Sequence, residues 1–472
     1  MSRIAMTARL STVAARPLAL LRSARTGRVA VALALTLCLS GGCALRGQSA
    51  SSPSLRRSAD EAAYGRIATT LSDGGGYGDS EMRDPYQWAP GAPVLFALAH
   101  DVGGGWIHAG FRIQAAYWAQ ALIGTLAIGV AFLLAALAAG AVGAPAPIAI
   151  AGLAAAAGVA FYPPLVAAAG SQLSEPLGAL LLLAACGALA AAQRRRRLPW
   201  LALCGALLGM AVLARADLLL APVLAAVIVA WRVAPGTRAL GRLAGAGVVL
   251  AASIAVIGPW VVAASVAQRR FVPVSDGGAS ALYIGTFLPG DGTLIGLKRE
   301  LAPETRRAHP GTRGEPAFRI PALIVLKTVA ERHPGVPKRV ALRRETSRNL
   351  RDYALGRPGA FLAMMGRKAG RMWLWPSRST LRDGVWSGTL GRILHLVLLV
   401  AAVLGLAAGL WRRRDPVLLL VAAIAVYSTL LNAVLIAEAR HNLPLLPALY
   451  AAGAAGWAIA LSARGAGHGA PS

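Results

Sequence analysis

The stretch EPLGALLLLAACGALAAAQRRRR, residues 175–197, joins one carboxylate to a cluster of arginines through an apolar run. The run approaches the roughly 20 residues that an α-helix needs to cross a lipid bilayer. Arginines beside a membrane span are retained on the cytoplasmic side. The stretch therefore predicts a transmembrane helix over 176–192, with its Arg-rich end in the cytoplasm and Glu175 near the opposite face.

Similar apolar runs recur along the chain, in which 56% of the residues are hydrophobic. Soluble domains contain about 45 to 50% apolar residues, so this composition disfavours a soluble protein. The runs predict an all-α polytopic membrane protein with about ten transmembrane helices. They occupy residues 29–45, 113–139, 146–168, 176–192, 199–214, 217–231, 243–266, 393–410, 416–436 and 443–462.

Arginine-rich segments alternate with the predicted spans and so define one side of the membrane. Placing them all in the cytoplasm leaves Asp415 as the only cytoplasmic residue among 20 acidic ones. Any chemistry is therefore predicted at the extracytoplasmic face. The cytoplasmic segments are 1–28, 193–197, 231–242 and 411–415; the outer segments are 46–112, 267–392 and the turns near 169–175, 214–217 and 438–442.

The topology divides the chain into five segments. They are a basic cytoplasmic N-terminus (1–28), a transmembrane core (29–266) with the first outer loop 46–112, an extracytoplasmic loop and interfacial segment (267–392), C-terminal transmembrane helices (393–462) and a cytoplasmic tail (463–472). The first apolar run ends in LSGGC, which resembles a lipoprotein box. A cleaved or lipidated signal is therefore the alternative to a retained first helix.

The net charge of +28 is explained by membrane orientation and lipid contact rather than by nucleic-acid binding. Orientation does not require the outer segment 267–392 to be basic as well. A phosphate-bearing partner at the outer surface would explain that excess. The four cysteines form no CxxC pair, and we infer from them neither a disulfide nor a metal site.

The first acidic residues of the chain, Asp60 and Glu61, stand side by side in the first outer loop. Ser58 and Glu61 have the spacing of a capping box, which favours a structural role for Glu61. Asp60 lies in the same helical turn, where the helix dipole also stabilises a carboxylate. Tyr64 follows Asp60 by four residues, so the two side chains share a helix face.

Other polar residues interrupt apolar sequence on the outer side. Glu175 precedes a predicted span, Arg215 and Asp217 separate two spans, and the turn EARHN contains Glu438 and Arg440. Polar groups near hydrocarbon are costly and are by default functional candidates. The alternatives are a neutralised Arg215–Asp217 pair that marks a turn and an ordinary solvated turn at EARHN.

The long outer segment contains two notable stretches. GRKAGRMW (366–373) predicts an amphipathic interfacial helix, in which Lys368 and Arg371 lie at the height of a lipid phosphate. The apolar stretch ALYIGTF (281–287) has strand propensity. Neither a phosphate-binding loop nor an HExxH motif is present.

In this order, the outer motifs resemble those of GT-C membrane glycosyltransferases related to protein O-mannosyltransferases and lipid A aminoarabinose transferases (glycosyltransferase family 39-like). The resemblance covers about residues 55–450. YQWAP departs from the YP usual in that family, and Ala264 and Ser265 stand where relatives often carry an Arg-Asn pair. The motifs are DEAAY, RDPYQWAPGAPVLFAL, SEPLGALLLL, LARADLLLAPV, PWVV, RRFVPVSDGGASALYIGT, GRKAGRMW and EARHNLPLLPAL.

The resemblance implies a GT-C core covered by the loop 267–392. It also implies transfer of a sugar from a polyprenyl-phosphate carrier to an envelope glycan, lipid or protein, with inversion at the anomeric centre. Asp60 would be the catalytic acid group and basic residues would stabilise the leaving phosphate. Metal dependence stays open, and no cofactor is certain. The supporting or substrate-binding candidates are Glu61, Tyr64, Glu175, Arg215, Asp217, Lys368, Arg371, Glu438 and Arg440.

Two other classes of protein remain as alternatives. A secondary transporter or lipid flippase also needs many helices and buried charge, and a non-catalytic scaffold of the cell envelope could share the core. Transporters typically place charges near the bilayer midplane. The charges of this chain are predicted to gather at one face, which favours surface chemistry over translocation.

Overall fold

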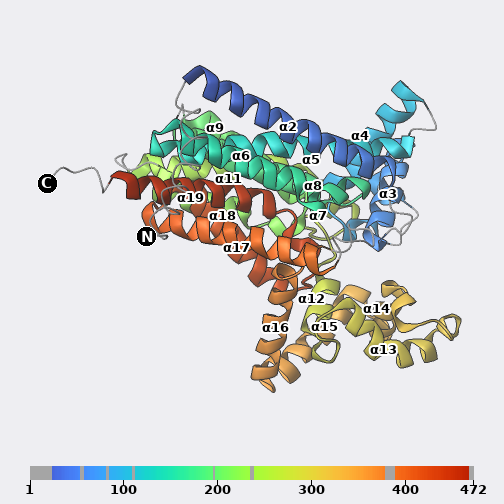
Figure 1. The fold of residues 1–472 in the computed structure, drawn as a ribbon. Helices are drawn as coiled ribbons and strands as arrows, with labels where there is room; N and C mark the ends of the chain where they lie inside the picture. The colour runs from blue at the N-terminus through green and yellow to red at the C-terminus, as the bar shows by residue number, and fades with distance from the viewer. Residues whose placement is uncertain are drawn as a thin grey trace, which may run out of the picture.

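The computed structural model describes residues 24–53, 58–80, 84–108, 112–194, 197–233, 239–377 and 388–466. Within these residues the chain is helical and contains no strand. The long helices lie side by side in a bundle, and α12 to α16 extend from one end of it (Figure 1). The predicted all-α class is confirmed.

Each predicted span coincides with helical structure. Seven helices are long and apolar enough to cross a membrane, and a bent pair makes an eighth. Proline residues follow the break in that pair, where the chain turns by 56°. The seven are α2 (Ala24–Ser51), α5 (Arg112–Ala139), α8 (Glu175–Ala192), α9 (Arg197–Ala214), α11 (Ala239–Ala267), α17 (Thr389–Arg412) and α18 (Pro416–Val434); the pair is α6 (Pro145–Phe161) and α7 (Pro163–Ala167).

Two of the ten predicted spans, 217–231 and 443–462, lie outside this set. They are α10 (Ala221–Ile228) and α19 (Leu446–Ala466), whose apolar part is Leu446–Ser462. This difference accounts for seven or eight long spans where about ten were predicted. Both helices follow irregular turns at the same end of the bundle, and these turns contribute to the site described below.

Small residues allow the helices of the bundle to pack closely. A Cβ atom at Gly456 of α19 would lie 2.0 Å from the carbonyl oxygen of Gly405 in α17. A Cβ atom at Gly453 would lie 2.5 Å from the carbonyl oxygen of Ala402. Glycine is therefore required where these helices cross, as expected for Ala- and Gly-rich membrane helices.

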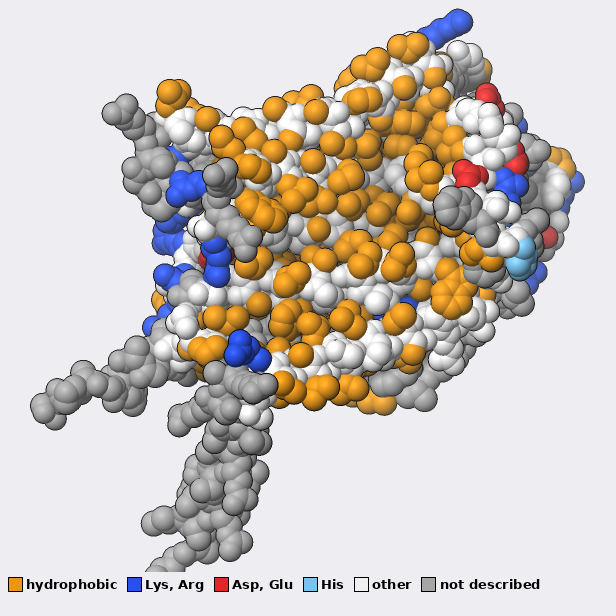
Figure 2. Space-filling model, turned by 90° about the horizontal axis from the view of Figure 1, so that it is seen from above, with side chains coloured by type: hydrophobic (Ala, Val, Ile, Leu, Met, Phe, Trp, Pro, Cys, Tyr) orange, Lys and Arg blue, Asp and Glu red, His pale blue; other side chains and the backbone are white. Residues whose placement is uncertain are grey.

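Arginine clusters between the spans lie together at one end of the bundle. Arg194, after α8, donates a hydrogen bond of 2.5 Å to Leu137 O near the end of α5. Its positive charge also attracts the carboxylate of Asp415, the residue before α18. Figure 2 shows a broad apolar belt with mainly Lys and Arg side chains at one end and a mixture of acidic and basic side chains at the other end.

The segment between α11 and α17 contains a small helical unit with its own apolar core. Tyr283 and Ile284 pack there with Leu297 and Val325. The strand propensity of residues 281–287 was misleading, because this stretch is helical and its apolar side chains enter that core. The helices are α12 (Gly278–Thr286), α13 (Leu294–Ala308), α14 (Ala322–Glu331), α15 (Lys338–Asn349) and α16 (Pro358–Trp373).

Candidate active site

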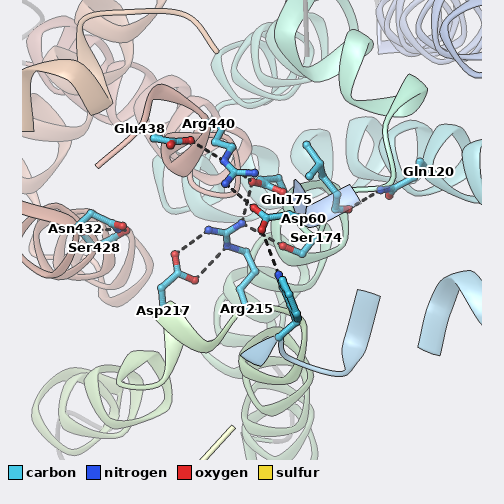
Figure 3. A network of polar contacts seen from close by, with 12 residues as sticks. Asp60, Gln120, Ser174, Glu175, Arg215, Asp217, Ser428, Asn432, Glu438 and Arg440 are labelled. Atoms are coloured by element: carbon cyan, nitrogen blue, oxygen red, sulfur yellow. Dashed lines mark hydrogen bonds and ion pairs between the residues drawn. The ribbon is translucent and has the colours of Figure 1, made fainter. Parts of the chain in front are cut away.

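Four segments that are distant in sequence meet at the acid-rich end of the bundle (Figure 3). They are α3 (Ala59–Ser72) of the first outer loop, the start of α8, the turn η7 (Ala216–Leu218) and the turn η14 (Ala439–Asn442). Together with the chain before α4 (Gly91–Val102), they line an acidic cavity that is open to solvent and has about 520 Å³ of empty space. Its lining residues are Asp60, Tyr64, Gln87, Trp88, Ala89, Leu173, Ser174, Glu175, Ala214, Arg215, Ala216, Asp217, Ser275, Arg440 and His441.

Asp60 lies in the first turn of α3, at the wall of this cavity. Its Oδ2 atom is 2.6 Å from Nη2 of Arg440, and its Oδ1 accepts a hydrogen bond of 3.2 Å from Nε1 of Trp88. Burial raises the pKa of Asp60, but the charge and hydrogen bond of Arg440 outweigh burial and hold this pKa below its ordinary value. Asp60 is therefore ionised, with 31% of its side chain exposed.

Glu61 has the predicted capping role. Its Oε2 accepts a hydrogen bond of 2.8 Å from Ser58 N, while its own N–H donates to Ser58 Oγ at 3.2 Å. Its Oε1 accepts a further hydrogen bond of 3.2 Å from Gln172 N. Both oxygens of Glu61 are thus engaged by backbone N–H groups, which tie the start of α3 to the turn before α8.

Arg215 and Asp217 form the pair that the sequence suggested. Nε and Nη2 of Arg215 donate to the two Asp217 oxygens at 3.1 and 2.9 Å. Nη1 also lies 3.2 Å from Oε1 of Glu175 and 3.3 Å from Ser174 Oγ. Gly178 makes room for this side chain, because a Cβ atom there would lie 2.8 Å from Arg215 Cδ.

A second guanidinium links this pair to Asp60. Nε of Arg440 lies 3.0 Å from Glu438 Oε2 and 4.0 Å from Glu175 Oε1. Carboxylates therefore outnumber guanidinium groups in the network of Asp60, Glu175, Asp217, Glu438, Arg215 and Arg440. An excess of negative charge in a half-buried cavity favours a cationic group or a reacting centre that develops positive charge.

Tyr64 and His441 complete the polar wall of the cavity. Tyr64 is buried one turn after Asp60, on the shared face that the spacing predicted. Burial and the neighbouring charge of Arg440 lower the pKa of His441, which is therefore neutral. Its Nδ1 is buried without a hydrogen-bond partner among the described residues.

Lys368 lies away from this cavity, in α16. Its buried Nζ donates to the carbonyl oxygens of Gly285, Val434 and Leu435 at 2.9, 3.3 and 2.5 Å. Burial, with a smaller effect of Arg371, lowers its pKa to about 8. An ammonium group has three donors, and all three are used here. The expectation that Lys368 contacts a phosphate is thus wrong for this arrangement: it ties α16 to α12 and to the end of α18.

Arg371 lines a second, largely apolar cavity, here called the apolar groove, with about 1050 Å³ of empty space. Its Nη1 lies 2.5 Å from Oδ2 of Asp291, and its Nη2 donates to Asp291 O at 2.9 Å. Arg440 lines this groove as well as the acidic cavity. The groove is formed by Thr293, Leu294, Ile295, Arg371, Trp375, Pro376, Ile436, Ala437, Glu438, Ala439 and Arg440.

Sequence reasoning missed three contributors to the site. Trp88 binds Asp60, Ser174 binds Arg215, and Asp291 anchors Arg371. The sequence offered one indication of Trp88, because this residue lies in the YQWAP stretch that departs from the family pattern. Ser174 and Asp291 had none, because their partners are far away along the chain.

A metal site is not evident in the part of the chain that the structure describes. No group of three or more His, Cys, Asp or Glu side chains is placed there to hold an ion. Arg440 and Arg215 instead lie between the carboxylates of the acidic cavity. The described site thus contains two built-in cations among its acidic groups.

Solved structures with a similar arrangement of helices include an archaeal enzyme. The oligosaccharyltransferase of Archaeoglobus fulgidus, tethered with an acceptor peptide, has a TM-score of 0.50 and 14% sequence identity over 90% of this chain and 49% of that chain. The chain has a GT-C membrane fold. It is accordingly a multi-pass membrane protein, as the apolar helices also indicate. At this identity the likeness shows the fold alone.

Two further solved structures are similar to the chain at lower scores. The oligosaccharyltransferase AglB of Archaeoglobus fulgidus, in complex with an inhibitory peptide and a dolichol-phosphate, has a TM-score of 0.48 and 14% identity, covering 91% of this chain and 50% of that chain. ArnT of Cupriavidus metallidurans, in the apo state, has a TM-score of 0.39 and 18% identity, covering 92% of this chain and 78% of that chain.

The chain spans about half the length of the archaeal structures that it matches. No family model matches the sequence. No curated protein matches it either.

Proposed function

We propose that the chain is a membrane glycosyltransferase that moves a sugar from a polyprenyl-phosphate carrier to an acceptor at the extracytoplasmic face. The observation that carries this proposal is the junction of the two cavities. An ionised, partly exposed Asp60 faces the acidic cavity, and its partner Arg440 also lines the apolar groove. A base for an acceptor and a cation for a phosphate are thus adjacent.

The acidic cavity suits the chemistry of sugar transfer. In the proposed step, the acceptor oxygen bonds to the anomeric carbon and its proton passes to a carboxylate oxygen of Asp60. The bond from the anomeric carbon to the carrier oxygen breaks, and its electron pair leaves with the phosphate. Attack from the side opposite the leaving group inverts the anomeric centre. Carboxylates around the cavity favour the positive charge that develops on the sugar.

The apolar groove suits the lipid part of such a donor. Isoprenoid chains bind apolar surfaces, whereas guanidinium groups bind phosphate through paired hydrogen bonds. Leu294, Ile295 and Ile436 provide the apolar wall, and Arg371 and Arg440 provide the cations. We therefore assign the phosphate to the space between these two arginines.

A third cavity gives the acceptor its own approach. It shares Gln87 and Trp88 with the acidic cavity and has about 1120 Å³ of empty space. Its wall includes the charged residues Asp84, Lys327 and Lys338. We assign the acceptor to this cavity: an envelope glycan, lipid or protein entering here would reach Asp60 past the indole ring of Trp88, which binds Asp60.

The proposed donor site predicts that Arg371→Gln raises the KM for a polyprenyl-phosphate sugar about tenfold, the effect of losing one charge-assisted contact. Arg367→Gln is the matched control, because Arg367 also binds Asp291, at 2.7 Å, but does not line the groove. The measurement is steady-state transfer from a panel of lipid-linked sugars. Equal effects of the two variants would assign Arg371 to packing alone.

The proposed sidedness predicts which surfaces are reached from outside the cell. In a Cys43→Ser background, Ser347→Cys on the exposed surface of α15 should react with a membrane-impermeant maleimide in intact cells. Gln193→Cys, after α8, should react only after the membrane is opened. The reverse labelling pattern would place Asp60 in the cytoplasm and overturn the proposed extracytoplasmic reaction.

The charged network also bears on the transporter alternative. Arg215, Asp217 and Arg440 lie in turns at helix ends, and the ion pairs that link them are on one end of the bundle. A translocation pathway typically needs such groups near the middle of the spans. The observed arrangement therefore favours transfer chemistry at one face.

A further inference from the structure

Arg440 belongs to both cavities of the site. In the acidic cavity its Nη2 binds Asp60 at 2.6 Å, and on the side of the apolar groove its Nε binds Glu438 at 3.0 Å. Its side chain is only 17% exposed. A long side chain of this kind can exchange partners by rotation about its own bonds, without movement of the backbone.

The observed pairing conflicts with the role proposed for Asp60. A carboxylate that binds a guanidinium is stabilised in its charged form and accepts a proton weakly. In addition, Asp60 Oδ1 and Oδ2 are both engaged, by Trp88 and Arg440 respectively. The structure therefore shows Asp60 in a state in which an acceptor hydroxyl would have to compete with Arg440.

We propose that Arg440 couples donor binding to the release of Asp60. With the groove empty, Arg440 binds Asp60; when a lipid phosphate enters the groove, Arg440 turns toward the phosphate and leaves Oδ2 of Asp60 open to the acceptor. The inference rests on the proposed function, because it requires a phosphate in the apolar groove. Arg440 acts here as a positioning residue for Asp60.

The surroundings of Asp60 support such an exchange. Trp88 would keep its hydrogen bond to Oδ1, so the carboxylate stays in place when Arg440 leaves. Arg371 and Arg440 both line the apolar groove, so a phosphate there would contact two guanidinium groups. The singly charged phosphodiester of the donor can then compete with the single carboxylate of Asp60 for Arg440. The acceptor site would thus be completed only when a donor is bound.

The coupling has a reciprocal consequence that can be measured without catalysis. If Asp60 and the phosphate compete for Arg440, removing the charge of Asp60 must strengthen phosphate binding. Asp60→Asn should tighten binding of farnesyl phosphate to the full chain in lipid nanodiscs by about threefold or more, the scale of one partly exposed ion pair. Asp60→Ser is a second variant that tests the same expectation.

Two controls separate this coupling from a general change in charge. Asp217→Asn removes one charge from the same cavity, but it frees Arg215 rather than Arg440. The affinity for farnesyl phosphate should therefore stay nearly unchanged. In an Arg440→Gln background, Asp60→Asn should no longer tighten binding. An equal gain in Asp217→Asn, or a gain that persists without Arg440, would overturn the coupling while leaving the donor site intact.

The same titration tells this failure apart from failure of the proposed function. Farnesol, which lacks the phosphate, is the reference ligand. If farnesyl phosphate binds no better than farnesol, and Arg371→Gln has no effect on its binding, the groove is not a phosphate site. That result would overturn both the proposed donor site and the coupling built on it.

Discussion

Asp60→Asn should lower the turnover of lipid-linked sugar transfer by roughly 10² or more, the scale of losing a general base. The amide keeps the shape of the side chain, and its oxygen can still accept the hydrogen bond from Trp88 Nε1. The lost pair with Arg440 is partly exposed, so its loss should cost at most about 1 kcal/mol of stability. The measurements are single-turnover transfer and thermal unfolding of the purified protein.

The neighbouring residue provides the matched control for this experiment. In Glu61→Gln, the remaining side-chain oxygen can still accept a hydrogen bond from one of the two backbone N–H groups, those of Ser58 and Gln172. The new amide NH₂ group faces the other N–H group and cannot accept its hydrogen bond. We expect a loss of about 1 kcal/mol of stability and near-normal turnover. Full activity in Asp60→Asn, or complete loss in a well-folded Glu61→Gln protein, would reverse the roles assigned to the two carboxylates.

The features that the sequence predicted correctly depend on neighbouring residues. The capping box of Ser58 and Glu61 needs only their spacing, and the Arg215–Asp217 pair needs only one turn of chain. Apolar runs likewise predict membrane helices from local composition. The arginine clusters are also local features, and their alternation predicts Asp60, Glu175 and Arg440 on one side of the membrane.

Other features depend on how the helices pack, which local patterns do not encode. Asp60 and Arg440 are 380 residues apart, and only the packing of the bundle brings them together. Lys368 lies on an amphipathic helix and was expected at the height of a lipid phosphate, but the carbonyl oxygens that accept its hydrogen bonds belong to two other segments. For the same reason, the packing of α12 overrode the strand propensity of residues 281–287.

The second large effect concerns the stability of the site rather than its chemistry. Arg215→Met should lower the free energy of unfolding by about 3 to 5 kcal/mol, because it leaves buried carboxylates without their cation. Glu175 and Arg215 have only 4% and 9% of their side chains exposed, and Asp217 has 19%. Thermal and denaturant unfolding in detergent micelles would measure the loss.

A matched substitution on the same end of the bundle tests the cause. Arg112 binds Asp73 at 2.7 Å, but the two side chains are 34% and 55% exposed, so Arg112→Met should cost less than about 1 kcal/mol. Adding Glu175→Gln and Asp217→Asn to Arg215→Met should recover part of the lost stability, because the unpaired charges are then removed. If Arg215→Met and Arg112→Met unfold alike, the buried network does not hold the four segments together, and the acidic cavity must be maintained by apolar packing alone.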